Sequence, residues 1–122
     1  MTDVCQLPAH ELVCLMSNRT LTCRDVVEVH LAHIDEVNPA LNALVEAANP
    51  ETCLAAADEA DGRAARGEPL GKVHGLPVVI KDVMKVAGLM CSGGVARWFG
   101  LSRTRTRRRC RGCAPRGPSC SG

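Results

Sequence analysis

The sequence predicts an α/β fold, in which helices pack against short β-strands. Two observations point to this class. Segments with apolar residues at helical spacing alternate with short runs of β-branched residues, in the order helix, helix, strand, helix, strand. Two strands alone make a poor sheet because their edges leave backbone donors and acceptors unpaired. We therefore expect one flank of a larger α/β sandwich.

Two helices are expected in the first forty residues. Leu7–Met16 carries apolar side chains at helical spacing. Thr22 followed by Asp25 is typical of a helix N-terminus, because each side chain can bond the backbone N–H of the other residue. Asn38-Pro39 is expected to end this second helix, since proline disfavours the helical conformation of the residue before it. One face of the second helix carries Val27, Leu31 and Ile34.

A short strand, a third helix and a second strand follow. Leu44–Ala47 fits a short strand, and Asn49-Pro50 begins an Ala-rich helix that extends to about Ala65 and stops at Gly67. Val78–Ile80 consists of β-branched apolar residues and is too short for a helix, so we expect a short buried strand there.

The charges divide the chain into two compositions. Residues 1–82 contain 6 Lys/Arg and all 13 Asp/Glu, a net charge of −7, whereas residues 83–122 contain 9 Lys/Arg and no acid, a net charge of +9. The joint is expected near Gly94, between a region 1–94 and an Arg/Cys/Gly/Pro-rich tail at 95–122. We expect the tail to be disordered, because like charges repel and little apolar surface is present. A reading-frame shift after about Gly94 in a GC-rich gene would produce such a tail.

The most informative segment is the run from His74 to Asp82. A Gly-x-Pro turn leads into the apolar run, and Lys81 stands at its end. A charged lysine at the end of a buried strand is costly unless it is paired or neutral. Lys81 is therefore either a structural ion, paired with Asp82, or a functional amine.

Gly75-x-Pro77-x-x-x-Lys81-Asp82 resembles the lysine motif of the amidase signature family. Further segments are similar to the family's early helix, the turn into its first strand, the approach to the lysine and the departure from it, and they occur in that order: 21–34, 38–43, 66–71 and 86–89. The resemblance covers residues 7–94. It implies the N-terminal portion of the amidase signature fold, with helices that flank part of a mixed β-sheet.

The resemblance implies hydrolysis of the C–N bond of a small carboxylic amide by a Ser–Ser–Lys mechanism. Lys81 matches the catalytic lysine, and we expect no cofactor and no metal. In the family a Gly/Ser-rich segment supplies both catalytic serines. No such segment follows Lys81 here, where the serines stand isolated, at Ser92, Ser102, Ser119 and Ser121. We therefore expect a truncated chain that is inactive alone.

The tail suggests an alternative, a small basic nucleic-acid-binding or interaction protein. Seven arginines could neutralise several phosphates, but no aromatic residues are interleaved to stack on bases: Arg103, Arg105, Arg107, Arg108, Arg109, Arg111 and Arg116. Cys110-x-x-Cys113 with Cys120 suggests zinc but lacks a fourth ligand nearby. His30 and His33 share a helix face, where a structural role is the alternative to metal binding.

Neither a membrane span nor a secretory signal is visible in the sequence. Five cysteines are scattered among the expected helices and strands, as buried free thiols would be: Cys5, Cys14, Cys23, Cys53 and Cys91. We therefore expect a reduced, cytoplasmic chain. We also expect it to self-associate through the exposed edge of its sheet.

Overall fold

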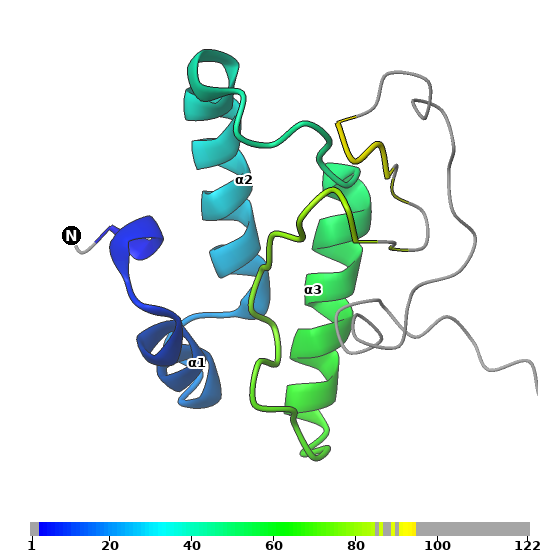
Figure 1. Cartoon of the computed structure of the whole chain (residues 1–122). Coiled ribbons are helices and arrows are strands. Elements are labelled where there is room, and N and C mark those ends of the chain that lie inside the picture. Colours follow the sequence, from blue (N-terminus) through cyan, green and yellow to red (C-terminus); the bar gives the residue numbers. More distant parts are fainter. Residues whose placement is uncertain (1–2, 85, 87–88, 90, 95–122) are drawn as a thin grey trace, which may run out of the picture. The chain divides into compact units, whose positions relative to one another are not determined.

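The computed structural model describes residues 3–84, 86, 89 and 91–94 (Figure 1). The chain divides into two units, Met1–Pro77 and Val78–Gly122. The first unit contains a 3-10 turn, η1 (Val4–Gln6), and three helices, α1 (Ala9–Ser17), α2 (Cys23–Leu41) and α3 (Pro50–Ala65). The expected basic tail at 95–122 lies outside the described residues.

The beginning of the chain forms η1 and α1. The Asp3 carboxylate accepts a hydrogen bond from the backbone N–H of Cys5 at 3.0 Å and caps η1. Pro8 immediately precedes α1. Leu12 and Met16 are one helical turn apart on α1 and are both buried. The predicted first helix is confirmed, with its start two residues later than expected.

Helix α2 begins at the predicted residue but continues past the predicted end. Thr22 is its N-cap and forms the expected capping box with Asp25. Pro39 lies inside the helix, so the prediction that Asn38-Pro39 ends it is wrong. A proline in the last turn removes a single backbone bond, and this loss does not stop the helix. Asn42, with a positive φ of 48°, closes the helix by donating its N–H to the Asn38 carbonyl at 2.6 Å.

Helix α3 starts and ends as predicted. The Asn49 side chain accepts the N–H of Glu51 at 2.8 Å, and Pro50 occupies the first helical position, where its missing N–H is not needed. At the other end, Arg66 donates its N–H to the Gly62 carbonyl at 3.1 Å, and Gly67 adopts a positive φ of 69°.

The core of the first unit is small and contains no aromatic side chain. Helices α2 and α3 lie side by side, and α2 also contacts η1 (Figure 1). The buried cluster consists of Leu12, Met16, Cys23, Val26 and Ala57. Val27, Leu31 and Ile34, the face predicted for α2, are half-buried. The face that is fully buried is the neighbouring one, which carries Cys23 and Val26.

The described residues contain no β-strand, so the sheet expected from the sequence is not present in this part of the chain. Leu44–Ala47 and Val78–Ile80 are irregular. A strand exists only where a neighbouring strand pairs with its backbone, and neither segment has such a partner among the residues that the structure describes. No helix in the described part of the chain has both the length and the apolar character to cross a bilayer.

Candidate functional site

Lys81, the predicted catalytic residue, lies in the second unit and is exposed. The residues before it are also open to solvent: Val78 is 50% exposed and Val79 is 74% exposed. The expectation of a buried apolar strand leading to the lysine is therefore wrong within the described residues. Burial of this run requires a surface to cover it, and a sequence pattern does not show where that surface comes from.

The Gly-x-Pro turn before the lysine is anchored on the helices of the first unit. Gly75 has a φ of +73°, a conformation that other residues rarely adopt. A Cβ atom at this position would overlap Sγ of Cys23 and come within 3.3 Å of Sδ of Met16. The sequence uses glycine here because the backbone lies directly against the side chains of α1 and α2.

His74 and Leu76, on either side of this glycine, add two further contacts. Nε2 of His74 lies 2.9 Å from the carbonyl oxygen of Ala60 in α3. A carbonyl only accepts hydrogen bonds, so Nε2 of His74 carries the proton and donates it. Leu76 packs against the buried cluster. All three helices therefore contribute to fixing the segment that leads to Lys81.

The backbone after Lys81 is fixed in another way. The N–H of Met84 donates to the Lys81 carbonyl at 2.8 Å and forms a turn. Within this turn the Asp82 carboxylate accepts two hydrogen bonds from Ser92, one from its N–H to Oδ1 at 2.8 Å and one from its hydroxyl to Oδ2 at 2.7 Å. Ser92 is buried, with 4% of its surface exposed. Nothing in the sequence pattern indicates that Ser92 has this partner.

The hydrogen bonds at Asp82 favour its charged form. The hydroxyl of Ser92 and then its backbone N–H are the main reasons that the pKa of Asp82 lies below the ordinary value of an aspartate. The backbone N–H groups of Gly93 and Gly94 act in the same direction, against partial desolvation, which raises the pKa.

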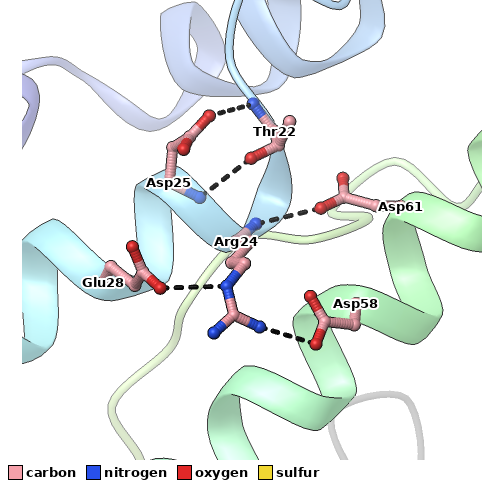
Figure 2. Close-up of polar contacts among 6 residues, drawn as sticks. All are labelled: Thr22, Arg24, Asp25, Glu28, Asp58 and Asp61. Atoms are coloured by element: carbon pink, nitrogen blue, oxygen red, sulfur yellow. Dashed lines mark hydrogen bonds and ion pairs between the residues drawn. The ribbon is translucent and has the colours of Figure 1, made fainter.

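A second polar cluster surrounds the first turn of α2 (Figure 2). Thr22 accepts the N–H of Asp25 at 3.0 Å, and the Asp25 carboxylate accepts the N–H of Thr22 at 3.0 Å. Asp61, from α3, accepts the N–H of Cys23 at 2.8 Å and that of Arg24 at 3.1 Å. The free N–H groups of this helix end are thus satisfied by side chains of two helices.

Arg24 extends the cluster across the surface of the two helices. Its guanidinium donates to Glu28 on the same helix at 2.9 Å and to Asp58 on α3 at 2.6 Å (Figure 2). These groups are about half exposed. Every member of the cluster has a structural partner, so we interpret it as the polar contact between α2 and α3.

Cys23 is the one buried cysteine of the described residues, and its thiol is not suited to nucleophilic chemistry. Desolvation, followed by the hydrogen bond to Asp61 and the charge of that carboxylate, raises the pKa of Cys23 to about 12. The thiolate, not the thiol, is the reactive form. The prediction of free thiols is confirmed for the described cysteines, but burial is confirmed for Cys23 alone among them: Cys14 is exposed, and Cys5, Cys53 and Cys91 are half-buried.

The other candidate residues do not converge on Lys81 within the described part of the chain. His30 donates from Nδ1 to the carbonyl of Val26 at 2.7 Å, a contact within one helix, and His33 is exposed. The described residues hold no cluster of three or more potential metal ligands. Ser102, Ser119 and Ser121, the arginines of the tail, and Cys110, Cys113 and Cys120 lie outside the described residues.

Comparisons with known proteins point to one family. The sequence model of the family described as Amidase matches residues 25–104. A glutamyl-tRNA(Gln) amidotransferase subunit of Alkalilimnicola ehrlichii is 40% identical over 84 residues, which are 69% of this chain and 17% of that protein. The corresponding subunit of Salinispora arenicola is 36% identical over 94 residues, or 77% of this chain and 19% of that protein. An acylamidase of Rhodococcus erythropolis is 33% identical over 89 residues, or 73% of this chain and 18% of that protein.

A solved structure also resembles the chain. It belongs to work on a vestigial protein complex that reveals the evolutionary origins of an s-triazine catabolic enzyme. It matches 82% of this chain and 22% of its own length, with a TM-score of 0.74 and 29% identity. This chain therefore spans about a fifth of the length of the curated relatives and of this structure.

Proposed function

This chain belongs to the amidase family, and on that premise we propose that it supplies the lysine of a site that hydrolyses carboxylic amides. The observation that carries the proposal is the family match over residues 25–104, which contains Lys81. In this function Lys81 accepts a proton from a serine, which in turn activates a second serine for attack on the amide carbon. The acyl–serine ester forms as the amide C–N bond breaks, the proton taken from the serine passes to the leaving amine, and water then cleaves the ester, which releases the acid and restores the serine.

A lysine accepts a proton only when its amine is neutral, and proteins obtain a neutral amine by removing it from water. Lys81 is exposed, so the described residues do not provide this cover. We infer that the working site needs a further surface over Lys81 and the exposed residues Val78 and Val79 before it. The same surface would carry the two serines.

A chimera tests the role of Lys81. Residues 1–94 would replace the matching segment of the Rhodococcus erythropolis acylamidase, which aligns with this chain over 89 residues. We expect amide hydrolysis by the chimera and a loss of about 10²–10⁴ in kcat for both Lys81→Ala and Lys81→Arg, the usual contribution of a proton-transferring side chain. Arginine keeps the positive charge but does not give up its proton.

The exposed Lys72 provides a matched control, because Lys72→Arg makes the same chemical change away from the proposed site. Its kcat should equal that of the unmodified chimera. A chimera with Lys81→Arg that keeps full activity would show that the lysine serves only as a charge. A folded but inactive chimera with Lys81 intact would overturn the proposed function.

We further propose that the 122-residue chain alone is inactive, because Lys81 is the one residue matched to the catalytic set. The test is ammonia release from simple amides at high protein concentration. Turnover by the purified chain that disappears in Lys81→Ala would contradict this proposal. A cytoplasmic location also remains a prediction from the sequence.

Self-association is a second proposal, supported by an exposed apolar run. Val78 and Val79 are 50% and 74% exposed. β-branched residues with an unpaired backbone can pair with a second copy of the same segment. We expect Val79→Asp to reduce the dimer fraction in sedimentation measurements, and Val45→Asp, at a position that is 67% exposed in the first unit, to leave it unchanged. A chain that is monomeric at all concentrations would refute the proposal.

A further inference from the structure

We propose that Ser92 and Asp82 form a positioning pair that fixes the backbone of Lys81 for the reaction. This inference rests on the proposed function, because it assigns residues that orient the proposed catalytic lysine. Neither side chain contacts a substrate in this proposal; both act through the main chain of Lys81.

The pair has a geometry that defines the orientation of the carboxylate. One residue, Ser92, satisfies both carboxylate oxygens of Asp82, at 2.8 Å through its N–H and at 2.7 Å through its hydroxyl. Hydrogen bonds to an ionised acceptor are shorter and stronger than bonds between neutral groups. Because the two donors differ in position, they also fix the carboxylate plane. The contact therefore closes the loop between residues 82 and 92.

The closed loop is connected directly to the lysine. Asp82 follows Lys81 in the chain, and the Lys81 carbonyl accepts the N–H of Met84 at 2.8 Å. The peptide between residues 81 and 82 is thus fixed on one side by the turn and on the other by the carboxylate. Because the peptide unit is planar, fixing it sets the position of the Lys81 Cα atom and leaves the rotation about the Lys81 Cα–C bond as the one backbone angle between this peptide and the side chain.

Ser92 is not suited to the alternative role of a nucleophile. Its hydroxyl hydrogen is directed to Oδ2 of Asp82, and its oxygen accepts the N–H of Gly94 at 3.2 Å. The residue is buried, with 4% of its surface exposed. The proton acceptor of this hydroxyl is a carboxylate whose pKa is lowered, which makes it a weak base for activating a nucleophile. Ser92 orients a neighbour instead.

Nuclear magnetic resonance on the full 122-residue chain tests the pair without any activity. In the unmodified chain the Ser92 amide proton should titrate together with the Asp82 carboxylate, and this titration should vanish in Asp82→Asn. The backbone order parameter of Lys81 should fall from about 0.85 to below about 0.6 in Ser92→Ala, the change from a rigid to a flexible backbone. Ser92→Thr, which keeps the hydroxyl, should restore it.

Ser17→Ala is the matched control, because Ser17 is an exposed serine at the end of α1. It should leave the Lys81 order parameter unchanged. An order parameter for Lys81 that does not move in Ser92→Ala would overturn the proposal, whether or not the chain takes part in catalysis.

Kinetics of the acylamidase chimera separate this inference from the proposed function. Ser92→Ala should lower kcat by about 10²-fold with little change in KM, the cost of misplacing a reacting group by about 1 Å. Ser92→Thr should recover most of the loss. An active chimera whose kcat does not respond to Ser92→Ala refutes the positioning pair alone. An inactive chimera with the pair intact in the magnetic resonance spectra refutes the proposed function alone.

Discussion

Removing the half-buried Asp61 carboxylate should destabilise the helical unit more than removing the carboxylate of Asp58, which lies on the same helix. Asp61 accepts the N–H of Cys23 at 2.8 Å and that of Arg24 at 3.1 Å, at a part-buried helix end. In Asp61→Ala both donors lose their acceptor. At about 1–3 kcal/mol for each unsatisfied donor, and with some access of water, the expected loss is about 2–4 kcal/mol. Asp61→Asn keeps one oxygen acceptor and should lose about half as much.

The matched control is Asp58→Ala, which removes an aspartate from the same helix. Asp58 forms an ion pair with Arg24 in which both side chains are about half exposed, and such pairs contribute about 0–1 kcal/mol. Urea unfolding followed by helical circular dichroism measures all three variants. If Asp61→Ala shifted the unfolding midpoint no more than Asp58→Ala does, the hydrogen bonds from Cys23 and Arg24 to Asp61 would not be what stabilises the start of α2.

The same unit allows three further tests. Gly75→Ala should lower the free energy of unfolding by about 2–4 kcal/mol, because alanine is strained at this positive φ and its Cβ would overlap Cys23. Gly71→Ala, where no atom lies near the added carbon, should leave the urea midpoint unchanged. The pKa of the buried Cys23 thiol is raised to about 12, so at about pH 8 it should react with iodoacetamide at least ~10²-fold more slowly than the exposed Cys14. Peptide mass spectrometry measures both rates, and equal rates would contradict the burial of Cys23. The capping box lowers the pKa of Asp25, so the carboxylate stabilises the folded chain above the ordinary aspartate pKa, and this stabilisation should be lost as the pH falls through the lowered pKa. A urea midpoint that stays constant from about pH 6 to about pH 2.5 would contradict this prediction.

The ends of the helices can be predicted from the sequence because they depend on near neighbours. Thr22 and Asp25 are three residues apart, and their reciprocal bonds need no other part of the chain. Asn49 and Pro50 define the start of α3 for the same reason. Pro39 is the exception, because a proline near the end of a helix costs a single bond, a loss too small to override the continuing turn.

Contacts between distant residues cannot be predicted in this way. Asp61 lies 38 residues after Cys23, and one acid among thirteen gives no sign of which helix end it caps. Ser92 stands alone in the sequence, and its partner becomes visible only when the loop closes. The apolar run before Lys81 predicts burial, but burial depends on a covering surface, and the run cannot supply one by itself.

The contacts on the two sides of Lys81 differ in kind, and this difference predicts separable effects. Before the lysine, Gly75 is held by close packing against Cys23, so changes there act on the stability of the helical unit. After the lysine, Asp82 is held by charge-assisted hydrogen bonds from Ser92, whose loss changes orientation more than stability. Substitutions at Gly75 should therefore shift the urea midpoint of the chain, and those at Ser92 should lower kcat of the acylamidase chimera. Suppose instead that substitutions at Gly75 and at Ser92 changed the urea midpoint and kcat in the same proportion. The orientation of Lys81 would then depend on the stability of the fold as a whole and not on these separate contacts.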